Sequence, residues 1–286
     1  MKEAPVRNGV RMGRWVVQAA GLSDRGLKRG HNEDSLSVVQ DMGVWIVADG
    51  MGGHNAGEVA SRQAIESIVE YVRIATLDQD AALPFPSDPA LSPAENSISA
   101  AIKVANRDVC NLSLEHQEYQ GMGTTLVAMQ FDPETDRIAI AHVGDSRCYR
   151  LRGGALSQLT LDHSWVSEQL QKRIITPEEA KNHRWRNVIT RALGNKLEVE
   201  VDVESHEIQN GDLFLLCSDG LSGMVGDELI ELILAECADL EEAIQRLIAA
   251  ANEAGGLDNI SAILVRFLDP EASADKSTGD TSEDTH

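Results

Sequence analysis

Four aspartates stand beside apolar runs that have the composition of buried strands. Asp49 follows Val-Trp-Ile-Val-Ala and Asp219 follows Leu-Phe-Leu-Leu-Cys-Ser, and each of the two is followed by glycine. Asp145 follows Ile-Ala-Ile-Ala-His-Val-Gly, and Asp258 lies in a glycine-containing loop just ahead of another apolar run. Strands that each end in a carboxylate can bring those groups together although they are far apart in the sequence. A shared acidic site that holds metal ions is therefore the first hypothesis.

A simple turn is the alternative for each Asp-Gly pair, because this dipeptide is common in turns. A hairpin turn needs a strand on both sides, whereas Asp49 is followed by a glycine-rich loop and then by residues with helical spacing. Glycine beside an acid lets the main chain come close enough for a carbonyl oxygen to become a ligand. Oxygen ligands favour Mg2+ or Mn2+, while zinc would call for His or Cys.

The acids require strands to position them, and the strand-like segments of the chain come in clusters. We expect strands over 15–21, 34–40, 44–48, 124–131, 137–143, 147–151, 198–206, 212–217 and 260–267. Helices are expected over 58–74 and 95–118, as a pair within 226–254, and in the polar segment 162–190. Clustered strands and paired helices predict an α+β fold in which antiparallel sheets are covered by helices.

One domain, residues 14–268, accounts for this pattern, with no internal repeat and no interior linker. Residues 1–13 contain no apolar core segment, so they do not form a secretory signal, and we expect them to be flexible. Residues 269–286 are acidic and almost free of apolar side chains, which predicts a disordered tail. No apolar stretch approaches the roughly 20 residues needed to span a bilayer, so we expect a cytoplasmic protein without a membrane segment.

Composition argues against two other classes of protein. The 286 residues carry a formal net charge of −21, which repels the phosphate backbone of a nucleic acid, and no concentrated basic run offsets it. The four cysteines lack the Cys-x-x-Cys spacing of a zinc knuckle and are too few for a dense disulfide framework. We expect them to be small buried side chains.

An ordered set of motifs over residues 25–261 resembles the metal-dependent protein Ser/Thr phosphatases of type 2C, the PPM family. Each motif alone is weak, but their order and spacing make the set specific. The motifs are Arg29-x-x-Asn32-Glu33-Asp34, Asp49-Gly50-Met51-Gly52-Gly53-His54, Gly123-Thr124-Thr125, Val143-Gly144-Asp145-Ser146-Arg147, Asp162-His163, Arg191-Ala192-Leu193-Gly194, Ser218-Asp219-Gly220 and Asp258-Asn259. The form of the second motif resembles the bacterial branch of the family.

The resemblance implies a β-sandwich of two antiparallel sheets flanked by pairs of antiparallel helices, with a metal cleft at one end. It implies that Asp49 bridges two Mn2+ or Mg2+ ions and that the Gly50 carbonyl joins one of them. Asp219 and Asp258 would hold the other ion. Asp34 would lie beside them and act through metal-bound water.

The resemblance also assigns Arg29 to phosphate binding and Asp145 to a weaker third ion. An untitratable guanidinium with a planar fork of donors suits phosphate oxygens. The alternatives are a surface arginine for Arg29 and a tight turn for Asp145. The implied reaction is hydrolysis of phosphoserine and phosphothreonine by a metal-activated bridging water, without a covalent intermediate.

The source of the proton for the leaving group is left open by the sequence. Eukaryotic members place a histidine directly after the Asp-Gly pair, where this chain has Met51. His54 is the nearest substitute and is a candidate general acid, because an ordinary His pKa suits acid catalysis near neutral pH. A metal-bound water is the alternative. Segment 162–190 corresponds to the family's flap, and its basic and aromatic cluster 183–186 either contacts a phosphoprotein or packs into the core.

The implied partners are phosphorylated proteins that are substrates of a Ser/Thr kinase, and we expect a monomer. A catalytically silent phosphoprotein-binding module of the same fold is the main alternative. Such a module would be expected to lose an aspartate or the arginine, and this chain retains all of them. A metal-dependent nuclease is opposed by the net charge, and no Asp-x-Asp-x-Asp-Gly loop supports a calcium-stabilised domain.

Overall fold

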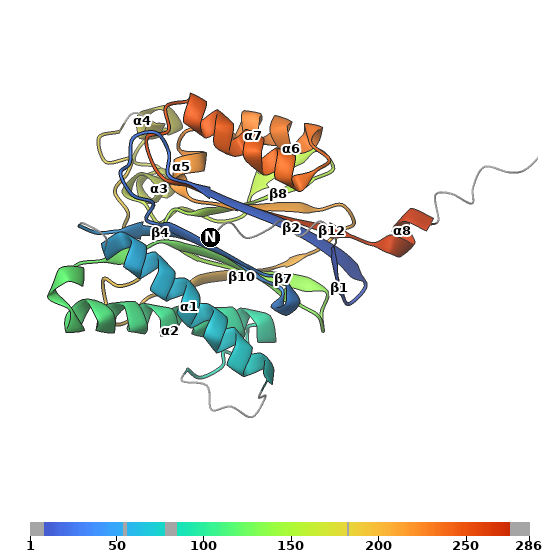
Figure 1. The fold of residues 1–286 in the computed structure, drawn as a ribbon, viewed down its shortest axis with the longest axis horizontal. Coiled ribbons are helices and arrows are strands. Elements are labelled where there is room, and N and C mark those ends of the chain that lie inside the picture. Colours follow the sequence, from blue (N-terminus) through green and yellow to red (C-terminus); the bar gives the residue numbers. More distant parts are fainter. Residues whose placement is uncertain (1–8, 54–55, 78–84, 182, 275–286) are drawn as a thin grey trace, which may run out of the picture.

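Two antiparallel sheets pack face to face and form the body of the protein (Figure 1). The computed structural model describes residues 9–53, 56–77, 85–181 and 183–274. The first sheet has the order β1-β2-β12-β11-β8-β9. Its strands are β1 (Val10–Met12), β2 (Trp15–Asp24), β8 (Arg147–Arg152), β9 (Ala155–Gln158), β11 (Leu213–Cys217) and β12 (Ile260–Leu268).

The second sheet has the order β10-β7-β6-β4-β3, and the short β5 pairs with the end of β4. Its strands are β3 (Asp34–Val39), β4 (Val44–Met51), β5 (Gly123–Thr124), β6 (Leu126–Asp132), β7 (Arg137–Val143) and β10 (Asp202–Glu207). Every strand pair in both sheets is antiparallel.

Helices cover the outer face of each sheet, so the protein has four layers (Figure 1). The long helices α1 (Ala56–Leu77) and α2 (Pro93–Glu115) cover the second sheet, and α6 (Asp227–Glu236) and α7 (Leu240–Glu253) cover the first. The short helices are α3 (Trp165–Gln171), α4 (Pro177–Lys181), α5 (Asp219–Ser222) and α8 (Pro270–Ala274), with 3-10 turns at Gln40–Met42 and Gln117–Tyr119. Among the described residues, none of the helices is both long and apolar enough to cross a membrane.

Aromatic and branched side chains fill the space between the sheets. Phe267 lies at the centre of this core, with ring centroids 6.1 Å from both Trp15 and Trp45 and 5.8 Å from Phe214. These edge-to-face contacts are the favoured geometry for aromatic pairs. The core therefore fixes how the two sheets sit on each other, and with them the strand ends.

Small side chains at helical spacing bring the outer helices close to the sheets. In α1, Ala60, Ala64, Ile68 and Val72 recur every four residues and are buried against the second sheet. Because alanine adds little bulk, this helix can lie close to β3 and β4, which it contacts along its length. Helix α3, by contrast, has no buried residues and therefore no such stripe.

The predicted α+β sandwich is confirmed, and the differences lie at element ends. The predicted strand 198–206 begins at Asp202, because its partner β7 ends at Val143 and Asp202 pairs with His142. Helix α2 begins before residue 95, because Ser92 caps it and Pro93 occupies the first position. Of the residues described within 162–190, only those of α3 and α4 form α-helix.

Two regular elements lie inside the predicted terminal segments. In segment 1–13, β1 forms a hairpin with β2 across Gly13, whose φ is +58°. In segment 269–286, α8 begins after Asp269, whose carboxylate accepts a hydrogen bond from the Glu271 main chain at 3.0 Å. A three-residue strand and a five-residue helix are too short for periodicity to reveal.

Candidate metal centre

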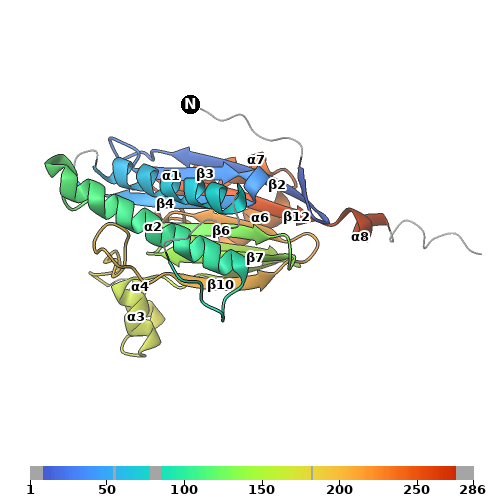
Figure 2. The same ribbon diagram turned by 90° about the horizontal axis from the view of Figure 1, so that it is seen from below.

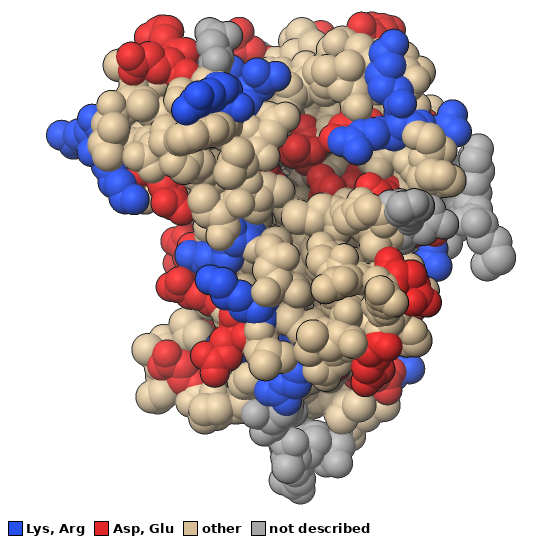
Figure 3. Space-filling model, turned by 90° about the vertical axis from the view of Figure 1, so that its left-hand side faces the viewer, with Lys and Arg blue, Asp and Glu red and all other residues tan. Residues whose placement is uncertain are grey.

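Strand ends bring the predicted acids to one end of the sandwich. Asp34 and Asp49 are direct partners in the β3–β4 register. Asp219 is the first residue of α5, just after β11, and Asp145 lies in the turn between β7 and β8. Asp258 precedes β12, and its charge raises the pKa values of Asp34, Asp49 and Asp219. Figure 3 shows acidic side chains on the floor of a hollow at this end of the molecule, with basic side chains beside them.

Burial makes these carboxylates hard to ionise. Burial raises the pKa of Asp34 to about 7, with Asp219 and Asp258 adding to the effect. The pKa of Asp145 also rises to about 7, through burial and then the charge of Asp219. Burial and the neighbouring Asp34 raise the pKa of Asp49 well above its ordinary value. Carboxylates crowded in this way gain from any cation that joins them.

Two carboxylate oxygens of the cluster lack a partner among the described residues. They are Oδ1 of Asp34 and Oδ1 of Asp145, both buried. The second oxygen of Asp34 accepts a hydrogen bond from Ser218 Oγ at 2.8 Å. Buried unsatisfied oxygens are costly, and a hard divalent cation is the group that oxygen-only ligands prefer. The residues therefore fit Mg2+ or Mn2+.

Gly50 occupies a position that only glycine can fill. A Cβ there would lie 2.1 Å from the Gly57 carbonyl oxygen and 2.6 Å from that of Glu33. The main chain of this turn is held by hydrogen bonds to the Asp49 carbonyl from Thr124 Oγ1 and from the Thr125 amide, each 2.9 Å. The backbone next to Asp49 is thus closely packed and fixed in place.

Arg29 lies at the edge of the cluster and pairs with one of the acids. Its Nη2 is 2.6 Å from Oδ2 of Asp258, and the Arg29 side chain is 48% exposed. The guanidinium therefore reaches the acidic hollow while keeping solvent access. Arg29 is a surface arginine that pairs with an acid of the cluster, and its binding of phosphate stays a prediction.

The acids do not form one compact shell around a single point. Among the described residues, the only three potential ligand atoms within 4.8 Å of one another belong to His142, His163 and Asp202. The aspartates of the cluster instead lie along the strand ends in neighbouring pairs. Such an arrangement offers ligands to more than one position.

Asn259 supports the site although the sequence suggested no role for it beyond its place in a motif. Its Nδ2 donates to the carbonyls of Arg25 and His31, each at 2.9 Å, and its Oδ1 accepts from the Glu33 amide at 2.8 Å. These bonds tie the loop that carries Arg29 to the strand that follows Asp258. The signal available in the sequence was its position directly after an aspartate.

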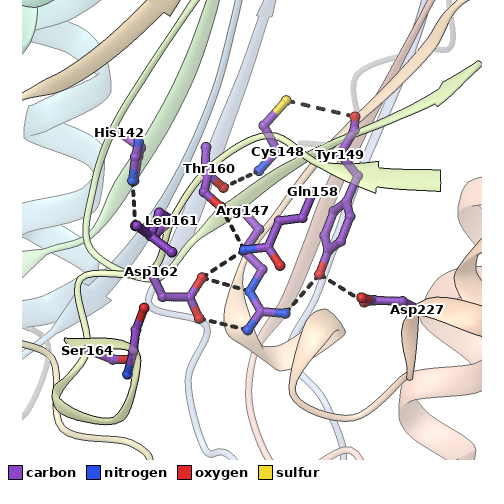
Figure 4. Close-up of polar contacts among 11 residues, drawn as sticks. His142, Arg147, Cys148, Tyr149, Gln158, Thr160, Leu161, Asp162, Ser164 and Asp227 are labelled. Atoms are coloured by element: carbon purple, nitrogen blue, oxygen red, sulfur yellow. Dashed lines mark hydrogen bonds and ion pairs between the residues drawn. The ribbon is translucent and has the colours of Figure 1, made fainter. Parts of the chain in front are cut away.

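A second charged cluster lies beside the acids, and here each charged group has a hydrogen-bonding partner (Figure 4). Arg147 donates to both oxygens of Asp162, at 2.9 and 2.7 Å, and to the Tyr149 hydroxyl at 2.8 Å. That hydroxyl donates to Asp227 at 3.2 Å. Asp145 and Asp219 line the same cavity as Arg147 and Asp162; its volume is about 560 Å³.

Helices α3 and α4 form the other wall of this cavity and project from the body (Figure 2). Trp165 stacks on His183 with centroids 4.5 Å apart, and Trp185 meets Trp165 edge-on at 4.7 Å. Trp185 is 40% exposed, so the prediction that it packs into the core is wrong. His54, the candidate general acid, lies outside the described residues.

Known proteins with similar sequences are protein phosphatases. The family model described as protein phosphatase 2C matches residues 27–269. The serine/threonine phosphatase stp of Listeria monocytogenes is 39% identical over 252 residues, 87% of this chain and 95% of that protein. The serine/threonine protein phosphatase PstP of Mycobacterium tuberculosis is 39% identical over 254 residues, but this chain spans only 46% of its length.

Solved structures agree with the sequence matches. The catalytic domain of PstP in complex with two manganese ions has a TM-score of 0.75 and 37% identity, covering 89% of this chain and all of that one. The phosphatase Stp1 of Staphylococcus aureus has a TM-score of 0.75 and 30% identity over 93% of this chain and 99% of its own. With the family model covering most of its length, the chain belongs to the protein phosphatase 2C family.

Proposed function

We propose that this chain is a metal-dependent phosphatase that removes phosphate from phosphoserine and phosphothreonine of phosphorylated proteins. One observation carries the proposal. Buried aspartates with raised pKa values meet at one end of the sandwich, and two of their oxygens lack partners among the described residues. Family membership and the names of the relatives support the same activity.

Each acid of the cluster has a proposed role in holding Mn2+ or Mg2+. Asp49 would be a ligand of both core ions, the Gly50 carbonyl would join one of them, and Asp219 and Asp258 would hold the other. Asp34, which pairs with Asp49 in the strand register and accepts a hydrogen bond from Ser218, would contact an ion through water. The manganese ions of the PstP catalytic domain support the choice of metal.

Asp145 is the proposed ligand of a weaker third ion. It lies apart from the β3–β4 pair, and its interaction with Asp219 supports a position between these two side chains. The unpartnered buried Oδ1 is the atom available for this role. Fewer neighbouring carboxylates raise the pKa of Asp145 than raise that of Asp49. A smaller concentration of negative charge around Asp145 agrees with weaker binding of a cation.

The chemistry divides between the ions and the chain. Bound divalent ions supply an acidified water and neutralise phosphoryl charge. Arg29 binds the phosphate oxygens of the substrate, which requires it to exchange its contact with Asp258 for one with phosphate. His54 remains the candidate for protonating the leaving oxygen. Trp185 of the flap is exposed and would contact the protein part of the substrate.

The proposal is tested by measuring phosphate release from a phosphothreonine peptide. The assay uses purified protein and a titration with Mn2+. The expected result is release that depends on Mn2+ and disappears with a chelator. A matched variant, Asp49→Asn, should bind less Mn2+ and release no phosphate. If the unmodified chain releases no phosphate at any metal concentration, the silent phosphoprotein-binding alternative takes the place of the enzyme.

A further inference from the structure

The two ends of the flap meet at His163. The Trp165 amide donates to the Val188 carbonyl at 2.8 Å, and the Thr190 amide donates to the His163 carbonyl at 2.8 Å. A bridge between Ser164 and Ile189 lies between these two bonds. The residues on either side of the flap therefore form a short paired stem, and His163 is at its root.

His163 is also bonded twice to the residue before Asp145. Its main-chain amide donates to the Gly144 carbonyl at 2.9 Å, and its Nδ1 accepts from the Gly144 amide at 3.0 Å. Gly144 has φ of +110°, and a Cβ there would lie 2.5 Å from Thr125 Cβ. Gly144 cannot carry a side chain, and its two main-chain polar groups are both held by His163: the amide by the buried imidazole and the carbonyl by the His163 main-chain amide.

The other nitrogen of the imidazole faces a fixed carboxylate. Nε2 of His163 is 3.2 Å from Oδ2 of Asp202, whose Oδ1 is 2.5 Å from Arg191 Nη1. Because Nδ1 accepts an amide proton, the neutral ring carries its own proton on Nε2 and donates it to Asp202. His142 stacks on the ring with centroids 4.6 Å apart. The ring is thereby locked in one tautomer and one orientation.

The same contacts make a metal ion at His142, His163 and Asp202 unfavourable, although their ligand atoms are close enough. The Nδ1 lone pair of His163 is used by the Gly144 amide. A guanidinium nitrogen of Arg191 is 3.1 Å from the remaining nitrogen, so a second cation there would be repelled. The cluster is therefore suited to orienting His163.

We propose that His163 is a positioning residue: by holding both polar groups of Gly144, it fixes the Asp145 carboxylate where the third ion binds. The inference rests on the proposed function for the identity of that ion. It adds a residue that touches neither ion nor substrate but sets the affinity of the weakest metal position. Groups that orient ligands in this way commonly affect metal affinity by about 10- to 100-fold.

Two variants of similar size separate the Nδ1 contact from the Nε2 contact. In His163→Asn the amide oxygen can stand near the place of Nδ1 and accept from Gly144. In His163→Gln the polar group extends toward the place of Nε2 and the acceptor for Gly144 is lost. Binding of Mn2+ is counted by electron paramagnetic resonance of the free ion, with folding checked by circular dichroism.

For His163→Gln we expect the dissociation constant of the weakest Mn2+ to rise by about tenfold or more, while the tighter ions bind as before. His163→Asn should bind Mn2+ much like the unmodified chain. His163→Ala should resemble Gln, and if it does not fold, the Asn and Gln pair decides. Unchanged binding in Gln, equal weakening in Asn and Gln, or no weaker third ion in the unmodified chain would each overturn the proposal. Because ion counting uses no substrate, a lack of phosphatase activity would refute the proposed function and leave this test intact.

Discussion

Two clusters of charged side chains line one cavity. They differ in whether their charged groups have hydrogen-bonding partners. In the first cluster, Arg147 donates to Asp162 and to the Tyr149 hydroxyl. That hydroxyl in turn donates to Asp227. On the same cavity wall, Asp145 has a buried oxygen with no partner among the described residues. Both clusters lie at strand ends of the same sandwich.

The contrast distinguishes paired charges, which fix the local structure, from unpaired carboxylates, which a bound cation would neutralise. A buried ion pair satisfied on all sides fixes local geometry and contributes little net stability. A group of buried carboxylates without counter-charge destabilises the chain by itself, and such a group persists where function requires it. On this reasoning, removing a charge from the unpaired cluster should cost activity and not stability. Removing a contact from the paired cluster should lower stability and leave activity nearly unchanged.

The largest expected effect comes from Asp219→Asn. We expect turnover of a phosphothreonine peptide to fall by at least about a hundredfold, because a ligand of an ion that stabilises phosphoryl charge is lost. Without metal, the variant should unfold at a higher temperature, since burial and then the charge of Asp258 raise the pKa of Asp219. Calorimetry with a chelator checks the second point. A variant that is both inactive and less stable would break the comparison.

Arg29→Ala should have the next largest effect. Charge-assisted hydrogen bonds to phosphate contribute about 1.5 to 3 kcal/mol each, so we expect kcat/KM to fall by about 10- to 100-fold. The pair with Asp258 is half exposed, so the free energy of unfolding should change by less than about 1 kcal/mol. Arg29→Lys, which keeps the charge and loses the planar fork, is the control and should be intermediate. Equal kinetics in all three proteins would remove Arg29 from phosphate binding.

The pH dependence of stability should distinguish the unpaired acids as well. The folded pKa values of Asp34 and Asp145 are about 7, above those of an unfolded chain, so the folded state holds more protons between about pH 4 and 7. Stability without metal should therefore be greatest at the acidic end of this window and fall as pH rises through about 7. Saturating Mn2+ should flatten this trend, because the ion replaces the protons. Melting temperatures from pH 5 to 8, with chelator or with Mn2+, give the comparison, and parallel trends would contradict it.

Strong strand signals predicted antiparallel sheets covered by helices, and the family resemblance implied that the sheets form a sandwich. Buried runs such as Val44–Met51 are apolar almost throughout, and their acids stand at the tips where partner strands also end. The ends of elements were less predictable, because they depend on where a partner strand stops or which side chain caps a helix. Segment 162–190 was the poorest case: its helices are short, and Trp165 of α3 stacks on His183, which lies outside any helix.

For the candidate site, the motifs named the acids but not what holds them. His163 was visible as part of an Asp-His motif, yet its bonds to Gly144 join residues 19 apart across a fold that the sequence does not specify. The same is true of Asn259, whose partners lie more than 220 residues away. Individual polar contacts over such distances follow from the exact placement of backbone atoms, which periodicity and composition do not encode.

Tyr149→Phe should give the smallest effect and the sharpest contrast with the acids. The hydroxyl of the buried Tyr149 accepts from the half-buried Arg147 and donates to the exposed Asp227, and its removal deletes both hydrogen bonds. A loss of about 1 kcal/mol in the free energy of unfolding is expected, because this is the typical net contribution of an intramolecular hydrogen bond. Chemical denaturation measures this loss, while Mn2+ affinity and turnover should stay near those of the unmodified chain, because Arg147 keeps both bonds to Asp162. If Tyr149→Phe instead weakened Mn2+ binding and left stability intact, the paired cluster would belong to the metal centre and the division between the two clusters would fail.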